Sequence, residues 1–117
     1  AQAFSGFMYM TGPSDGPPHP VGVGMADVTA GVHAFASIGY ALFNRERTGE
    51  GQWMDISMVD CLFAMHEMNL QVPQVNPEYQ PRRMGNHHHL ICPCGVFKSP
   101  QGHIAILVVQ NQWRNMC

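Results

Sequence analysis

The sequence has little charge and no long run of charged residues. Only 12% of its 117 residues are charged, and the formal net charge is -2. A typical soluble domain is roughly 25% charged. The longest basic run is the pair Arg82–Arg83, so the chain lacks the basic patch of a nucleic-acid-binding protein, and we predict no nucleic-acid partner. Such low charge also predicts that further chain or a partner covers much of the surface.

Long apolar runs and a disulfide framework are also missing. The stretch Val28–Phe43 is uncharged, but polar residues and glycines interrupt it, and it is shorter than the roughly 20 residues of a membrane helix. Among the four cysteines, Cys61 lies in a predicted helix, while Cys92 and Cys94 are too close for an ordinary mutual disulfide. We therefore predict no membrane partner and free thiols in a reducing compartment. The predicted location is cytoplasmic, with mitochondria and peroxisomes left open.

The two ends of the sequence suggest a piece of a longer protein. It starts without Met, and it stops directly after Asn111–Met116, which has the pattern of an amphipathic helix start. We expect a fragment cut at both ends.

The first half of the chain predicts part of an α/β layer. Residues 27–47 have a helical pattern and are apolar nearly all round, which is typical of a buried helix. Residues 52–57 predict a strand, and residues 58–70 predict a second helix, opened by the start signal Ser57–Asp60. Helix, strand and helix at short intervals indicate an α/β architecture.

The second half changes character after residue 71. Prolines at positions 73, 77 and 81 argue against a continuous helix, so residues 72–91 are the predicted linker. Beyond it, Gly95–Lys98 and His103–Val109 flank the turn Ser99–Gly102, which predicts a β-hairpin. Asn111 is the predicted cap of a following helix.

Asp27 is the acidic residue whose position is most informative. A glycine-rich approach, Gly22–Gly24, places it at the start of the apolar helix, where the helix dipole and free N–H groups favour negative charge. A carboxylate fixed in this way suits a nucleophile. It also suits an N-cap, because Asp is a preferred capping residue. The residues alone favour the cap.

Other candidate sites are weaker. A metal site could combine His87–His89 with Cys92, Cys94 and His103, but Cys-x-Cys is a tight spacing, three consecutive histidines cannot readily face one ion, and no second knuckle follows. We therefore predict no metal site. Cys61 is predicted to be a structural thiol. His33 is predicted to lie at the edge of the core, where it could line the same cavity as Asp27.

Several segments together resemble one family, in order along essentially the whole chain. They are Ala1–Gly6, Thr11–Pro18, Ala26–Asp27 with Gly31, Arg45–Gln52, Asp55–Met58, Arg83–Asn86 and Gly95–Phe97. This succession resembles the class III CoA-transferases, the family of formyl-CoA transferase and carnitine CoA-transferase, with α-methylacyl-CoA racemase as a relative. The stretch His87–Cys94 departs from the family pattern, with more histidines than usual and a cysteine in place of an aromatic residue.

The resemblance reverses the preference for a cap at Asp27. It implies that Asp27 is the catalytic nucleophile, which attacks an acyl-CoA thioester and forms first a mixed anhydride and then an aspartyl-CoA thioester. Met58 matches a position that lines the CoA site. The implied substrates are an acyl-CoA and a small carboxylic acid, with coenzyme A as part of the substrate and no permanently bound cofactor.

The resemblance also implies the architecture. Residues 1–71 would belong to a Rossmann-like large domain, residues 72–91 to a linker, and residues 92–117 to the start of a small α+β domain. The full-length protein would be an interlocked homodimer, and this fragment alone would be inactive.

Two alternatives to CoA transfer follow from the same residues. An acyl-CoA racemase or epimerase would use Asp27 as an acid or base at the α-carbon, with a second such group on the opposite face. Outside enzymes, the histidines and cysteines of residues 87–103 would make a small metal-binding or interaction module.

Overall fold

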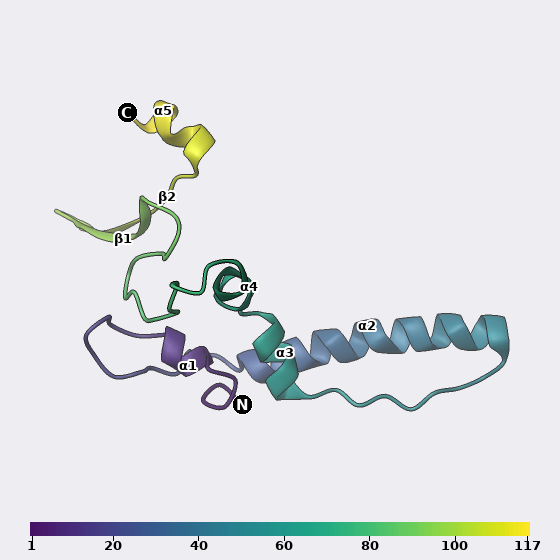
Figure 1. Ribbon diagram of the computed structural model, residues 1–117. Helices are drawn as coiled ribbons and strands as arrows, with labels where there is room; N and C mark the ends of the chain where they lie inside the picture. Colours follow the sequence, from purple (N-terminus) through teal and green to yellow (C-terminus); the bar gives the residue numbers. More distant parts are fainter.

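The computed structural model describes all 117 residues. Figure 1 shows the helices in the first two thirds of the chain and a hairpin followed by short helices at the end. The elements are α1 (Phe7–Met10), α2 (Met25–Thr48), α3 (Met58–Ala64), α4 (Met68–Val75), β1 (Cys94–Ser99), β2 (Gly102–Leu107), the 3₁₀ helix η1 (Gln110–Gln112) and α5 (Trp113–Met116).

The predicted long helix is confirmed as α2, which spans Met25–Thr48. It ends where Gly49 adopts a φ of 77°, and the Gly49 N–H donates to the Arg45 carbonyl over 2.8 Å. Only glycine adopts this left-handed conformation without strain. Arg45 and Arg47 in the last turn complement the negative end of the helix dipole.

The prediction that this helix is buried is wrong for the chain by itself. Ala26 is its one buried residue, and Phe35 is 81% exposed. The radius of gyration of 19.1 Å exceeds the roughly 13 Å of a compact domain of this length. The reason is geometric: within this chain, only the first turns of α2 have another helix packed on them, so the rest of its apolar surface has no partner.

The predicted strand at residues 52–57 is also wrong. This segment is an extended loop that runs back along α2 towards α3 (Figure 1). A strand needs a neighbour that satisfies its backbone hydrogen bonds, and the only sheet pairs β1 with β2. The residues favour an extended backbone here, but no segment of the chain pairs with it.

The predicted second helix begins where expected and then breaks. Ser57 caps α3, since its hydroxyl oxygen accepts a hydrogen bond from the Asp60 N–H over 3.2 Å. The helix ends at Ala64, and Glu67, with a φ of 36°, turns the chain into α4. Pro73 lies inside α4, which ends at Val75, so helical structure extends a few residues into the proline-rich segment but no continuous helix crosses it.

The core is small and lies where α3 packs across the first turns of α2. Leu62 is fully buried there, with Cys61 and Ala26 almost so. Figure 1 shows α1 and the N-terminal segment on the same side of the crossing. Two polar residues, Ser5 and His66, are buried with them, and the His66 Nε2 bonds the Ser5 carbonyl over 2.8 Å. This bond satisfies polar groups that would otherwise destabilise the core.

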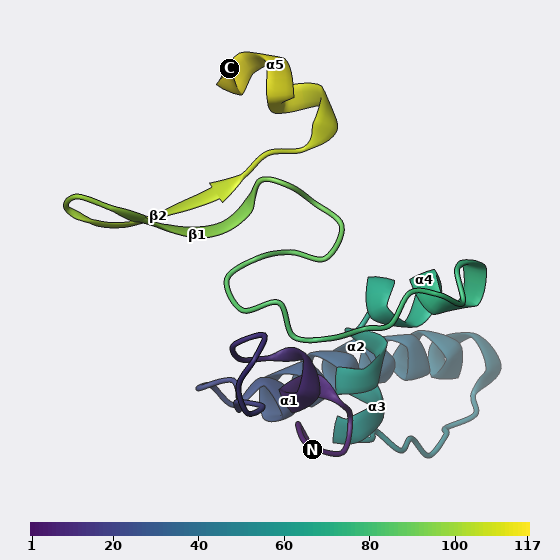
Figure 2. The ribbon, with the colours of Figure 1, turned by 60° about the vertical axis from the view of Figure 1, so that its left-hand side comes forward.

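The predicted hairpin is confirmed. β1 and β2 are antiparallel, with Cys94 opposite Leu107 and Ser99 opposite Gly102. Figure 2 shows the hairpin and α5 well separated from α2 and α3, joined to them by the irregular segment after α4. The expected cap at Asn111 is wrong, because η1 already includes this residue and begins at Gln110.

The division into a large domain, a linker and a small domain stays a prediction. Helix α4 extends into residues 72–75, so the segment expected as a linker starts within a helix. None of the helices combines the length and apolar character needed to span a membrane.

Truncation of Leu62 tests the small core. Leu62→Ala removes a fully buried side chain and is expected to lower the free energy of unfolding by about 2–5 kcal/mol. The volume-conserving control Leu62→Met should lower it by less than about 1.5 kcal/mol. Urea unfolding of the full-length protein measures both values, and equal losses would show that Leu62 does not fill a tightly packed core.

Candidate active site

Asp27 is the third residue of α2, and its carboxylate is exposed. The interpretation as an N-cap is wrong, because Gly24 holds the cap position and no side chain makes a capping hydrogen bond there. The carboxylate forms no hydrogen bond or ion pair with any residue of the chain. It is therefore held by its backbone position and free to meet a ligand.

The first turn of α2, which carries this carboxylate, also has free backbone N–H groups. The first intrahelical bond runs from the Val28 N–H to the Gly24 carbonyl over 3.1 Å, and the amides of Ala26 and Asp27 have no backbone partner. Such groups at a helix start attract negative charge.

Gly24 leaves room for the Asp27 side chain. A Cβ atom at residue 24 would lie 3.3 Å from the Asp27 Oδ2, tighter than an ordinary van der Waals contact. Glycine thus lets the carboxylate lie close to the backbone that leads into the helix.

Helix α3 borders this end of α2. The Thr29 hydroxyl, one half-turn after Asp27, lies 3.4 Å from the Met65 Sδ. Met58 is the first residue of α3 and is 48% exposed. Its role at a CoA site stays a prediction, as does the role of Asp27 as the nucleophile.

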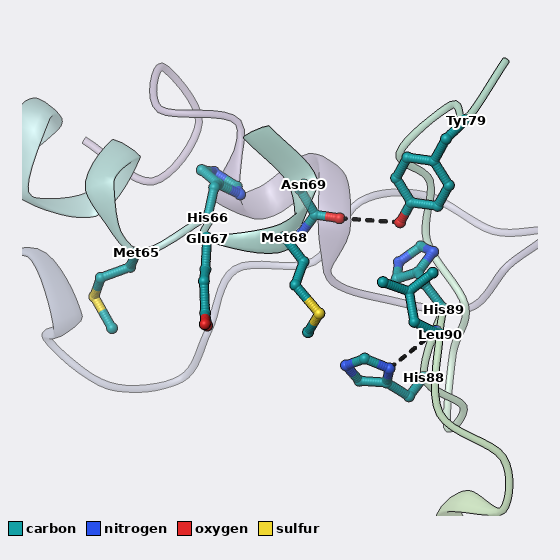
Figure 3. Close-up of a pocket in the computed structure, with 9 residues that line it drawn as sticks. All are labelled: Met65, His66, Glu67, Met68, Asn69, Tyr79, His88, His89 and Leu90. Atoms are coloured by element: carbon teal, nitrogen blue, oxygen red, sulfur yellow. Dashed lines mark hydrogen bonds between the residues drawn. The ribbon is translucent and has the colours of Figure 1, made fainter. Parts of the chain in front are cut away.

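A small cavity lies between the α3–α4 connection and the segment that carries the consecutive histidines. Figure 3 shows its lining, with Glu67 and Met68 on one wall and His88 and His89 on the other. Its volume is about 140 Å³. The Tyr79 hydroxyl donates to the Asn69 Oδ1 over 3.4 Å and joins the two walls. Burial, then the neighbouring charges of His88 and Arg82, hold the pKa of His89 below its ordinary value of 6.5.

The candidate metal ligands do not converge. His87 packs edge-on against Phe97, with ring centroids 5.7 Å apart, and His89 packs in the same way on Tyr79 at 6.0 Å. The His88 Nδ1 accepts hydrogen bonds from the backbone of Leu90 and Ile91. No three histidine, cysteine or acidic side chains are close enough together to hold a metal ion.

His33 does not line a cavity with Asp27. Its Nδ1 lies 2.8 Å from the Thr29 carbonyl of its own helix. It faces a separate hollow of about 250 Å³ with Asp55, Asp60 and Cys61. Cys61 is buried, as expected for a structural thiol.

Two positioning residues have no clear signal in the sequence. His66 ties the end of α3 to the N-terminal segment, and its ring packs on Phe7 with centroids 4.9 Å apart. The Arg83 guanidinium donates to the Tyr9 carbonyl over 2.9 Å and stacks on the Tyr9 ring. Both contacts join residues more than 60 positions apart, so no local pattern reveals them.

The pattern of CoA-transferase family III matches residues 1–117. The chain therefore belongs to this family, as the resemblance predicted.

Similar proteins include the succinyl-CoA:mesaconate CoA-transferase of Haloarcula hispanica, 37% identical over all of this chain and 30% of its own length. The succinate–glutarate CoA-transferase of Agrobacterium fabrum is 36% identical over 99% of this chain and 29% of its own length. Among solved structures, a CAIB/BAIF family protein from Brucella suis superposes with a TM-score of 0.80 at 30% identity, over 98% of this chain and 30% of its own. The α/β fold class is thus confirmed, and the chain spans about 30% of the length of these relatives.

The lowered pKa of His89 predicts a pH-dependent stability. The unfolded chain binds a proton at His89 more readily than the folded chain, so stability is fully present above pH 6.5 and falls as the pH drops below it. His89→Gln should flatten this fall, while His103→Gln on exposed β2 should leave it unchanged. Urea unfolding of the full-length protein between neutral pH and pH 5 measures the effect. A histidine resonance for residue 89 that titrates above 6.5 would contradict it.

Proposed function

We propose that the full-length protein transfers CoA from an acyl-CoA to a carboxylic acid through a covalent intermediate on Asp27. The observation that carries the proposal is the free Asp27 carboxylate beside unpaired N–H groups at the start of α2, in a chain of CoA-transferase family III. The similar proteins named above act, by their names, on succinyl-CoA, mesaconate, succinate and glutarate. We therefore take short dicarboxylic acids and their CoA thioesters as the substrate class.

In the first half of the reaction, CoA moves from the donor acyl group to Asp27, and the donor acid is released. An Asp27 oxygen attacks the thioester carbonyl of the donor, the C–S bond breaks, and CoA thiolate leaves behind a mixed anhydride. The thiolate then attacks the Asp27 carbonyl carbon, which forms an aspartyl-CoA thioester and releases the donor acid as its carboxylate. Each step retains an activated acyl bond, so none requires an external energy source.

The second half repeats the same steps in reverse with the acceptor. The acceptor carboxylate attacks the aspartyl thioester and releases the thiolate, giving a second anhydride. Attack of the thiolate on the acceptor carbonyl yields the new acyl-CoA and restores Asp27. The amides of Ala26 and Asp27 have no backbone partner, and we take them as the donors that stabilise the oxyanions of these steps.

The proposal also includes the assembly of the protein, its cofactors and its location. Tyr40, Phe35 and Phe43 on α2 are more than half exposed within this chain, which supports burial of this helix by additional protein in an interlocked homodimer. We expect no permanently bound cofactor and a cytoplasmic location.

Asp27→Asn tests the nucleophile. Asparagine keeps the shape of the side chain but cannot form the anhydride, so kcat should fall on the order of 10³-fold or more with CoA binding largely intact. Asp60→Asn is a matched control, because Asp60 is likewise the third residue of its helix, and it should retain activity. Steady-state transfer to succinate measures both, and turnover by Asp27→Asn would refute the nucleophile role.

Trapping and isotope exchange separate transfer from racemisation. Hydroxylamine added during turnover should convert Asp27 to its hydroxamate, detected by peptide mass spectrometry. A racemase would instead exchange the α-proton of an acyl-CoA with deuterated solvent and leave Asp27 unmodified.

Met58→Ala tests the proposed CoA contact. Loss of this half-exposed side chain at the start of α3 should raise the KM for acyl-CoA about 3- to 10-fold with little change in kcat. Val59→Ala on the same turn serves as the comparison. Equal effects of the two changes would assign Met58 a packing role only.

A further inference from the structure

The side chain of Gln2 binds the backbone that leads into α2. Its Oε1 accepts a hydrogen bond from the Val21 N–H over 2.8 Å, and its Nε2 donates to the Val21 carbonyl over 3.2 Å and to the Val23 carbonyl over 3.4 Å. The carboxamide therefore pairs with both polar backbone groups of Val21, as a residue of a neighbouring strand would. These contacts span 19 and 21 positions of the sequence. The catalytic steps proposed above do not use Gln2.

The Val23 carbonyl that Gln2 binds is part of the turn that starts α2. The Met25 N–H donates to this carbonyl over 2.8 Å, and Gly24 between the two residues has a φ of -73° and a ψ of 57°. These values and this hydrogen bond define an inverse γ-turn. Because one carbonyl accepts from both Met25 and Gln2, the Gln2 side chain holds the turn from outside the helix.

The turn is connected to Asp27 in two ways. The Gly24 carbonyl accepts the first intrahelical hydrogen bond, from the Val28 N–H over 3.1 Å, so its direction sets the first turn of α2. A Cβ atom at residue 24 would lie 3.3 Å from the Asp27 Oδ2, so the carboxylate lies close to the turn. A displacement of the turn would therefore move the carboxylate relative to the free amides of Ala26 and Asp27.

Gln2 is itself anchored to the core. Its carbonyl accepts hydrogen bonds from the Ser5 hydroxyl over 3.3 Å and from the Met8 N–H over 3.2 Å. Ser5 is buried, and its own carbonyl is bonded by His66, just after α3. Figure 1 and Figure 2 both show the N-terminal segment beside α1 and the start of α2. The α3 region thus holds the start of α2 twice, by direct packing and through Ser5 and Gln2.

We propose that Gln2 is a positioning residue for Asp27. Its carboxamide holds the backbone of Val21 and Val23, which fixes the turn at Gly24, and the turn keeps the Asp27 carboxylate aligned with the free amides at the start of α2. The inference rests on the proposed function, which makes Asp27 the nucleophile. Because Gln2 forms no bond with Asp27 itself, its loss should slow the chemical steps without weakening substrate binding.

Gln2→Met tests this role in the full-length protein, since methionine has nearly the same length and volume but removes all three hydrogen bonds. The kcat for CoA transfer to succinate should fall about 10- to 100-fold, the effect of a small misplacement of a reacting group. The KM values for acyl-CoA and succinate should stay within about twofold. Gln80→Met is the matched control, because Gln80 also donates to a backbone carbonyl, that of Pro77 over 3.5 Å, and it should retain kcat.

Hydrogen exchange measured by peptide mass spectrometry gives a readout without turnover. In Gln2→Met, the Val21 N–H loses its acceptor and the Met25 N–H loses the support of its turn, so both should exchange about tenfold faster. The amides of the β1–β2 hairpin should exchange as in the unmodified protein, which also shows that the variant is folded. Gln80→Met should leave exchange at Val21 and Met25 unchanged.

The outcomes separate the two proposals. If the unmodified protein transfers CoA, then a Gln2→Met variant with full kcat, or with a raised KM and full kcat, would overturn the role of Gln2 and leave the Asp27 chemistry standing. Faster exchange spread evenly over the hairpin and α2 would also overturn it, since Gln2 would then support the fold in general. If the unmodified protein transfers no CoA, the proposed function fails. Faster exchange confined to Val21 and Met25 would still support Gln2 as the residue that holds the start of α2.

Discussion

The packing of α3 across the first turns of α2 is the contact on which the rest of the site depends. Leu62 is fully buried at this crossing, and Ala26, directly before Asp27, is buried with it. The start of α2 is thereby fixed although most of the helix has no partner within the chain. Because free N–H groups exist only at a helix start, fixing that start also fixes the polar environment of the carboxylate. Ala26 is thus packed in the core, while the next residue, Asp27, stays exposed.

Polar ties extend this arrangement to the loops. His66, buried at the end of α3, bonds Ser5, and Arg83 bonds Tyr9. These two contacts hold the N-terminal segment and the segment after α4 on the same part of the molecule. A hydrogen bond to a buried partner contributes little net stability but is expensive to leave unmade. Such ties therefore specify position more than they add stability, which is what a site assembled from distant loops requires.

Local chemistry explains which parts of the structure could be predicted. The ends of α2 and the start of α3 follow from Gly49, Arg45 and the Ser57 cap, which act within a few residues. The β1–β2 hairpin could be predicted from the turn residues Ser99–Gly102. The two predictions that were wrong depend on contacts with distant segments. Residues 52–57 are extended but have no strand to pair with, and α2 is apolar but uncovered. The sequence encodes a preference for burial, whereas burial itself needs a partner that this chain does not contain.

The site shows the same division. The ordered motifs located Asp27, and the structure corrects its local role, since Gly24 and not Asp27 caps the helix. The ties made by His66 and Arg83 depend on contacts across most of the chain, which no motif reports. The histidine run was the weaker candidate in the sequence, and its three rings face an aromatic ring, the backbone and a tyrosine.

The central claim is that a substrate carboxylate becomes bonded to Asp27 during turnover, and oxygen transfer tests it most directly. An acceptor acid labelled with ¹⁸O in its carboxylate is incubated with the full-length protein and an acyl-CoA, and the peptide that contains Asp27 is analysed by mass spectrometry. Because the acceptor oxygen bridges the second anhydride and stays behind when the thiolate attacks, the account predicts label in the Asp27 carboxylate. Label confined to the acids and the new acyl-CoA, with Asp27 unlabelled after many turnovers, would contradict it.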